Sequence, residues 1–236
     1  MATKAYRYIG RGIYSLAEAE RLSGVPRRRI RRWMYGYAYT YKGQRRRSAP
    51  PVASDLEQPE GTKLVGFADV IEVRFLNAFR EYGVSWKYIR IAAERAKELL
   101  GRHHPFSSRI FKTDGRTILA ELAKSTGDKF LLDLVHDQWE FERIISPYLY
   151  AGIDYNQLHE PERWWPLGTD RQVVIDPHRS FGAPVVTEGV PTRILASAFD
   201  AEESLEFVAK LYEVSVQAVR DAVEFERRPA DEILPR

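Results

Sequence analysis

The stretch that decides the fold of the N-terminal region is YSLAEAERLSGVPRRRIRRWM, residues 14–34. Ser15 followed by Glu18 is the capping-box pattern, so a helix is predicted to begin directly after Ser15. Gly24 is predicted to end this helix, because a left-handed backbone there is sterically easy for glycine. Pro26 suits the first turn of a second helix, where the N–H that it lacks would have no partner. Two short helices with a tight turn between them form a helix-turn-helix.

Five of the six residues from 27 to 32 are arginines. Val25, Ile30 and Trp33 are spaced to face the first helix, which leaves the arginines on the other sides. The start of a recognition helix meets base edges in the major groove, and arginine pairs with guanine or with phosphate. We therefore predict DNA contacts from Arg27, Arg28, Arg29, Arg31 and Arg32. The alternative interpretation is a basic helix face that is merely solvated.

An alternating aromatic segment follows the second helix. Tyr37, Tyr39 and Tyr41 have the period of a strand, and Lys42-Gly43 is a plausible turn before three further arginines. Such a hairpin, or wing, would lie along the phosphate backbone beside the recognition helix. The predicted DNA-contacting set is therefore completed by Tyr14, Tyr39, Lys42, Arg45, Arg46 and Arg47. Residues 48–63 are predicted to be an exposed loop.

Charge is distributed unevenly along the chain. The first 50 residues contain 13 lysines and arginines against two acids, although the whole chain contains 36 and 33. From Asp200 to the end, ten acids stand against five bases. A basic head and an acidic tail predict a polyanion bound at one end and a protein contact, or dimerisation, at the other.

Composition excludes several classes of protein. The chain has no cysteine, which excludes disulfide scaffolds and cysteine-bound zinc and fits a reducing, cytoplasmic location. No apolar run approaches the roughly 18 residues of a membrane helix, so no membrane partner is expected. The five histidines lack metal-ligand spacing, and phosphate-loop and nucleophile-elbow motifs are absent. We therefore expect no metal, no cofactor and no enzyme, although an active site assembled from scattered residues stays open.

The stretch GFADVIEVRFLNAFREYGVSWKYI, residues 66–89, resumes helical periodicity, with Gly83 ending one helix and Ser85 starting another. This order of elements resembles the MerR-type winged helix-turn-helix over about residues 13–100. Arg31 and Trp33 match that family's R-x-aromatic end of the recognition helix. The resemblance implies DNA binding. The chain nevertheless lacks the long C-terminal coiled coil through which MerR regulators pair.

Two patterns mark the middle of the chain. Asp114-Gly115 is a two-residue hairpin signal between apolar segments. Residues 129–149 form a long amphipathic pattern, which predicts a helix in the core or in a dimer seam.

The C-terminal part predicts a strand, VVID, a hairpin that turns at Glu188-Gly189, and three short helices from about Ile194, Ser204 and Ser215. Residues 173–226 resemble the domain-of-unknown-function family numbered 433, which is associated with antitoxins. The matching residues are Asp176, Pro177, Gly182, Pro184, Val185, Gly189, Pro191 and Thr192.

Together the two resemblances make the chain similar to a VapB-type antitoxin of the long, two-domain kind. This implies operator DNA and a PIN-domain ribonuclease toxin as partners, and we expect a homodimer because two half-sites are needed for useful specificity. A frayed C-terminal tail is an equally good interpretation of the predicted toxin contacts Arg227, Arg228, Ile233 and Leu234.

The expected fold is mainly α with small β-hairpins, in the α+β class. A winged helix-turn-helix would span residues 1–102, a hairpin, long helix and linker 103–170, and a strand-led three-helix domain 171–236. The alternative function is a one-component regulator that senses a small molecule, with helix 129–149 and the RWWPLG segment lining the pocket.

Overall fold

The computed structural model describes residues 8–52, 54, 56–81, 83–111, 119–120, 123–124, 127 and 151–229. Some predictions lie outside these residues: the turn at Asp114-Gly115, helix 129–149, and the tail residues Ile233 and Leu234. Within the described part the chain is mainly helical, with three two-stranded antiparallel sheets, so the α+β prediction is confirmed.

The predicted helix-turn-helix is present. Helix α1 (Leu16–Ser23) begins with the predicted capping box: the Glu18 N–H donates to Ser15 Oγ, and the Ser15 N–H donates to Glu18 Oε2. Gly24 ends α1 in the left-handed conformation, with φ of 69°. Helix α2 (Arg27–Tyr35) begins one residue after Pro26, which therefore precedes the first turn and does not lie in it.

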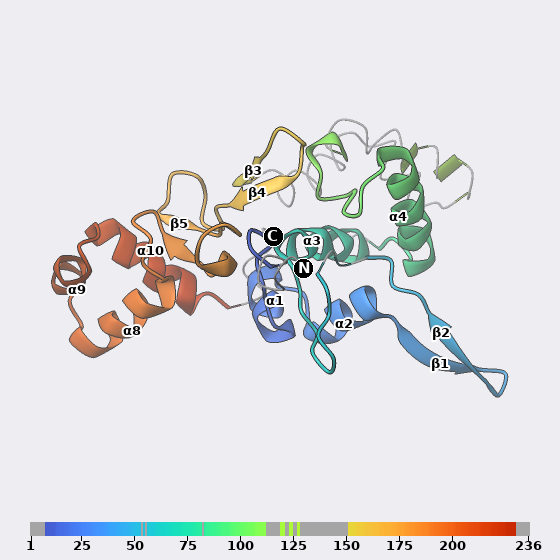
Figure 1. The fold of residues 1–236 in the computed structure, drawn as a ribbon, viewed down its shortest axis with the longest axis horizontal. Helices are drawn as coiled ribbons and strands as arrows, with labels where there is room; N and C mark the ends of the chain where they lie inside the picture. The colour runs from blue at the N-terminus through green and yellow to red at the C-terminus, as the bar shows by residue number, and fades with distance from the viewer. Residues whose placement is uncertain are drawn as a thin grey trace, which may run out of the picture.

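The predicted wing is also present. Strands β1 (Tyr37–Tyr41) and β2 (Gln44–Ser48) pair antiparallel around Lys42-Gly43, and the hairpin projects from the body beyond α2 (Figure 1). Both turn residues have positive φ, at 49° and 75°. Two consecutive left-handed residues are the requirement of a two-residue hairpin turn whose twist matches the strands.

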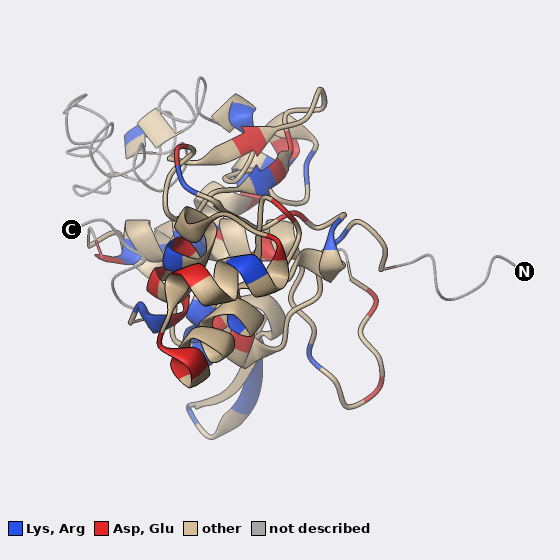
Figure 2. Ribbon diagram, turned by 90° about the vertical axis from the view of Figure 1, so that its left-hand side faces the viewer, with Lys and Arg blue, Asp and Glu red and all other residues tan. Residues whose placement is uncertain are grey.

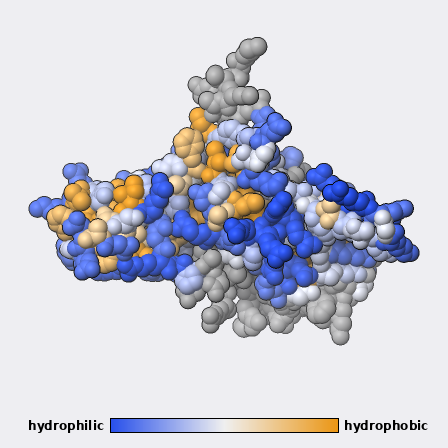
Figure 3. Space-filling view, turned by 90° about the horizontal axis from the view of Figure 1, so that it is seen from below, coloured by the Kyte–Doolittle hydropathy of each residue, from blue (hydrophilic) through white to orange (hydrophobic). Residues whose placement is uncertain are grey.

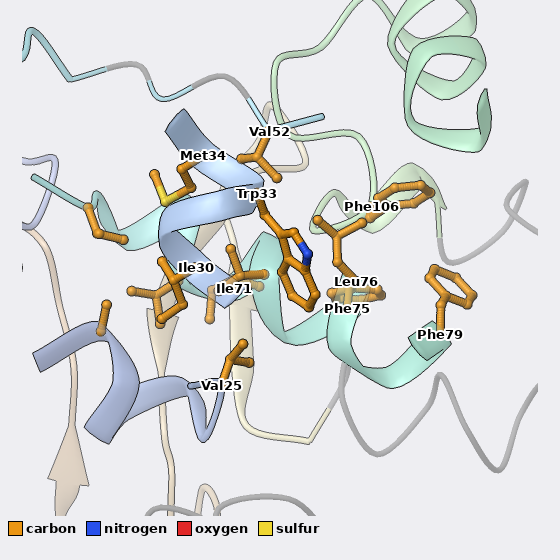
Figure 4. Close-up of a cluster of buried hydrophobic side chains, with 14 of the residues drawn as sticks. Val25, Ile30, Trp33, Met34, Val52, Ile71, Phe75, Leu76, Phe79 and Phe106 are labelled. Atoms are coloured by element: carbon orange, nitrogen blue, oxygen red, sulfur yellow. The ribbon is translucent and has the colours of Figure 1, made fainter. Parts of the chain in front are cut away.

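Helix α3 (Phe67–Glu81) packs behind the helix-turn-helix and α4 (Trp86–Leu100) follows it. Figure 4 shows Ile30 and Trp33 of α2 in one cluster with Ile71 and Phe75 of α3. The Trp33 ring stacks on Trp86 at 5.2 Å, with 16° between the planes. The prediction that Trp33 faces the first helix therefore needs correction, because its ring is buried against α4.

A second hairpin, β3 (Ile153–Tyr155) with β4 (Pro161–Trp164), lies over α3. Trp164 is fully buried, and the guanidinium carbon of Arg74 lies 4.1 Å from its ring centroid. The neighbouring Trp165 donates from Nε1 to Asp154 at 2.9 Å. The aromatic segment therefore fastens this hairpin onto the N-terminal core.

The C-terminal part follows the predicted order. Strands β5 (Val173–Val174) and β6 (Val185–Val186) pair antiparallel around a short 3-10 turn, η2 (Ser180–Gly182). The predicted turn at Glu188-Gly189 is confirmed by a bond from the Gly189 N–H to the Val186 carbonyl, at 2.8 Å.

Three helices complete the fold: α8 (Thr192–Glu202), α9 (Leu205–Tyr212) and α10 (Val216–Arg227). Helices α9 and α10 begin directly after Ser204 and Ser215, close to the predicted starts, and each serine caps its helix by accepting from an N–H in the first turn. These helices enclose a core of their own, while β5 and Phe225 belong to the core of the N-terminal part. The predicted domain boundary at residue 171 stays a prediction. Strand β5 follows that residue in sequence, but its Val173 packs in the core of the N-terminal part.

Candidate nucleic-acid interface

All five arginines on α2 are exposed, and two of them also pair with acids: Arg29, described below, and Arg27, whose Nε lies 3.9 Å from Glu20 Oε2. The arginines lie on the solvent side because Ile30, Trp33 and Met34 take the buried side of this nine-residue helix. The guanidinium carbon of Arg32 lies 4.1 Å from the centroid of the Tyr37 ring. This cation–π contact directs Arg32 toward the wing, so the helix and the hairpin present one basic surface.

Arg29 is placed differently from its neighbours. Its Nη1 donates to Asn77 Oδ1 at 2.7 Å and to Glu81 Oε1 at 2.6 Å, and both acceptors belong to α3. Arg29 therefore holds α2 against α3, and its charge is largely compensated inside the chain.

The two faces of the wing carry different side chains. The register sets Tyr39 opposite Arg46 and Thr40 opposite Arg45. Because residues on alternate positions share a face, Arg46 lies with the three tyrosines, whereas Arg45 and Arg47 lie on the other side. At the tip, the Arg46 guanidinium and the Lys42 ammonium lie 5.2 Å and 5.7 Å from the Tyr41 ring centroid.

A groove of about 520 Å³ separates the end of α2 from the wing. Its described lining contains five cationic side chains and no acidic one. The cations are Arg31, Arg45, Arg46, Arg47 and Lys63, interleaved with Tyr35 and Tyr37. Concentrated positive charge in a concave surface attracts an anion, and a strand of nucleic acid supplies a row of them.

Lys63 is the member of this groove that sequence reasoning missed. Its Nζ lies 4.5 Å from the centroid of the Tyr35 ring, and the Tyr35 hydroxyl donates to the Leu64 carbonyl at 2.6 Å. The Gln58 side chain bonds to the backbone of the same residue on both sides, accepting from the Leu64 N–H at 2.8 Å and donating to the Leu64 carbonyl at 3.0 Å. Burial, followed by the charge of Asp69, raises the pKa of Tyr35 to about 12, so it remains a donor.

The segment predicted as an exposed loop therefore folds back beside the wing. A lone lysine in a polar loop carries no local signal of this role. It is the tertiary contact with Tyr35 that brings Lys63 into the groove.

Gly36 sets the angle between α2 and β1. It has φ of 69° and ψ of −175°, a backbone region that is essentially restricted to glycine. A Cβ at this position would overlap the carbonyl oxygen of Ser48, the last residue of β2, at the base of the wing. Glycine is thus required both by the backbone conformation and by the close approach of Gly36 to Ser48 at the base of the wing.

Tyr14 does not fit its predicted role as a DNA contact. Only 3% of the residue is exposed, and its hydroxyl donates to the Gly182 carbonyl at 2.8 Å. Burial, reinforced by the charges of Glu18 and Asp176, raises the pKa of Tyr14. Tyr14 therefore joins the N-terminal and C-terminal parts of the fold, because its ring is directed inward.

The two tail arginines predicted to contact a toxin are engaged within the chain. Arg227 Nη2 lies 2.7 Å from Asp200, and Arg228 donates from Nη1 to the Pro166 carbonyl at 3.3 Å. Their predicted role is untested, but a partner would have to compete with these contacts.

The C-terminal lobe and the wing differ in charge. Figure 2, in which the C-terminal helices are nearest the viewer, shows acidic residues among basic ones on this lobe and basic residues along the wing. The basic surface formed by α2 and the wing lies at the opposite end from α8 and α9 (Figure 1).

Comparison with known proteins agrees with this geometry. A family model described as "Putative DNA-binding HTH domain" matches residues 12–93, which include α1, α2, the wing and α3. A curated relative, "Putative antitoxin VapB45" of Mycobacterium tuberculosis (strain ATCC 25618 / H37Rv), is 30% identical over 223 residues, covering 90% of this chain and 92% of the relative. The chain belongs to the VapB antitoxin family.

A solved structure extends this VapB family assignment to the fold. The crystal structure of Rv2018 from Mycobacterium tuberculosis superimposes with a TM-score of 0.69 at 29% identity, over 89% of this chain and 96% of that one. The family model and the antitoxin relative together point to a regulator of the antitoxin class. The predicted resemblance to an antitoxin is thus confirmed at the level of the family.

No described helix of this VapB-family chain is long and apolar enough to cross a membrane. Among the residues that the structure describes, no three His, Asp or Glu side chains gather as a metal site would require.

Proposed function

We propose that this VapB-family antitoxin binds operator DNA, as a homodimer, with α2 in the major groove and the wing along the adjacent backbone. The observation that carries the proposal is the groove between α2 and the wing, whose described lining has five cationic side chains and no acidic one. Arg27, Arg28 and Arg31 project from the recognition helix toward bases or phosphates. Lys42, Arg45, Arg46 and Arg47 hold the backbone, and Tyr39, which is 42% exposed, packs against it.

The experiment is a titration of the dimer with its operator duplex at several salt concentrations. Each neutralised phosphate contributes about −0.9 to the slope of log affinity against log salt. Replacing Arg31, Arg45 and Arg47 together by alanine should flatten the slope by about three. Arg220→Ala, an exposed arginine on α10, is the matched control. An unchanged slope in the triple variant contradicts the proposed interface.

We also propose that the chain binds and neutralises a PIN-domain ribonuclease toxin through its C-terminal half. The support is the antitoxin family itself, together with the acidic character of the end that lies away from the DNA-binding surface. Affinity purification of the tagged chain from its native host should recover a small metal-dependent ribonuclease in near-stoichiometric amount. Recovery of the chain alone, with DNA but no nuclease, contradicts this part of the proposal.

A second candidate is the small-molecule regulator, which one observation favours. A cavity of about 600 Å³ lies where the start of α3 meets residues 101–108 and the β3–β4 hairpin. On its wall, His104 Nε2 lies 2.7 Å from Asp69 Oδ1. The cavity lining does not include Trp164 or Trp165, so the RWWPLG segment does not fit the lining expected of it. A metabolite screen scored by the change in operator affinity, without any toxin, distinguishes this function from the first.

A further inference from the structure

Helix α9 exposes an apolar face that its own core does not use. Val208 and Ala209 point into the three-helix core, whereas Phe207 and Leu211 are 50% and 58% exposed. Four residues separate the two, so they lie on the same side of the helix. Ile194 of α8 is 38% exposed, and Figure 3 shows apolar side chains gathered on this lobe of the molecule.

Exposed acidic residues flank the apolar pair in the sequence. Glu203, at the end of α8, Glu206, one residue before Phe207, and Glu213, two residues after Leu211, are all exposed. Lys210 is the cation between them on α9, and Arg193 is exposed on α8. Three carboxylates against two cations leave a small excess of negative charge, which disfavours nucleic acid as the occupant because phosphates would be repelled.

A second copy of the chain is also a poor occupant. A two-fold contact brings the same surface of each protomer together, so the excess of carboxylates would face itself. Complementarity requires a partner with apolar residues at the centre and positive charge around them.

We propose that the α8–α9 face, defined by Ile194, Phe207 and Leu211 with Glu203, Glu206 and Glu213, binds the toxin on the surface that the toxin uses for RNA. This inference rests on the proposed antitoxin function. A ribonuclease must present positive charge to the phosphates of its substrate. The acidic residues of this face complement that charge, while the two large apolar side chains supply the desolvated centre that carries most of the affinity of an interface.

The position of this face has a consequence for the assembly. It lies at the opposite end of the molecule from the wing (Figure 1), so toxin and DNA occupy separate surfaces. One chain therefore has room for both partners at once.

The test uses the full-length chain and the nuclease that co-purifies with it. Phe207→Ala with Leu211→Ala should weaken binding of that nuclease, measured by calorimetry, at least about 100-fold. Leu99→Ala, at a 48% exposed position on α4, is the matched control and should leave the affinity unchanged. Operator affinity and thermal unfolding should match the unmodified chain in both variants, because all three side chains are exposed.

Charge reversal provides a second variant that leaves the apolar residues intact. Glu203→Lys with Glu206→Lys should weaken nuclease binding at least about tenfold, with the larger effect at low salt. A non-cleavable oligoribonucleotide should compete with the unmodified chain for the nuclease. Formation of a three-component complex of nuclease, RNA and chain overturns the assignment to the RNA surface.

The outcomes separate the two proposals. If the unmodified chain binds the nuclease but both double variants bind equally well, the α8–α9 face is wrong and the antitoxin function stands. If the apolar variant instead turns a dimer into a monomer in sedimentation, a second copy occupies the face and the inference is overturned. If the unmodified chain binds no nuclease, the proposed function fails, and this inference with it.

Discussion

Arg29 and Glu81 form an ion pair of 2.6 Å between α2 and α3, which is shorter than the 3.9 Å pair that Arg27 of the same helix forms with Glu20. Both side chains are about half exposed, so the pair itself stabilises the fold by at most about 1 kcal/mol. The pair matters because it directs the Arg29 guanidinium toward α3 and fixes the position of the helix that carries the other arginines.

We expect Arg29→Ala to leave the salt dependence of DNA binding nearly unchanged. Arg28→Ala and Arg31→Ala should each reduce the slope of log affinity against log salt by about one, because their charges are uncompensated. Fluorescence anisotropy at four or more salt concentrations measures all three slopes. Equal slopes for Arg29→Ala and Arg31→Ala would show that Arg29 leaves Glu81 to bind a phosphate.

Lys63→Ala should weaken binding to the operator and to unrelated duplexes by the same factor, since a phosphate contact carries no sequence information. The salt slope should again fall by about one. Tyr35→Phe removes the bond that pins Leu64 and should produce a smaller loss in the same direction. Lys210→Ala, on the C-terminal lobe, is the control. A loss confined to the operator sequence would instead assign Lys63 to base recognition.

Gly36→Ala should abolish high-affinity DNA binding while the helices remain folded. The added methyl overlaps the Ser48 carbonyl, so the wing must swing away from α2. Gly43→Ala is the matched control, because Gly43 also has positive φ but its Cβ would meet nothing within 4 Å. It should cost about 1 kcal/mol of stability and little affinity. Similar affinities for the two variants would refute this role of Gly36.

Asp221→Asn should lower the free energy of unfolding by about 3 kcal/mol. The buried Asp221 carboxylate accepts from Arg171 Nε at 2.9 Å, from the Gln172 N–H at 2.8 Å and from Gln217 Nε2 at 2.6 Å. An asparagine oxygen cannot satisfy all three donors. Urea unfolding at pH 7 followed by circular dichroism measures the change.

The same carboxylate should make the stability of the fold depend on pH. Burial alone would raise its pKa, but the bonds from Arg171, Gln172 and Gln217 outweigh it and lower the pKa of Asp221. The contribution of Asp221 to the free energy of unfolding is therefore complete above its unfolded-state pKa of about 3.9. It is lost as the pH falls through the lower pKa of the folded state. The stability difference between the unmodified chain and Asp221→Asn should shrink below pH 4. A difference that is constant from pH 7 to pH 3 would contradict this.

In the N-terminal half, local sequence signals were sufficient to predict the helix-turn-helix and the wing. The capping box at Ser15, the left-handed Gly24 and the alternating tyrosines each act within a few residues, so helix-turn-helix and wing follow from the sequence. The same holds for Ser204 and Ser215, whose side chains cap α9 and α10. Such signals do not depend on the rest of the fold.

The sequence by itself therefore determined the helix-turn-helix, the wing, the three C-terminal helices, the separation of charge and the basic face of α2. It did not indicate the β3–β4 hairpin, which lies in a segment predicted to be a linker. Tertiary structure decided which charges are available: Arg29 is taken by Glu81, Tyr14 is buried against Gly182, and Lys63 is brought to the wing by Tyr35. The physical reason is range. Capping and periodicity act over three or four neighbours, whereas the burial or pairing of a side chain depends on residues that are distant in sequence and meet only when the core forms.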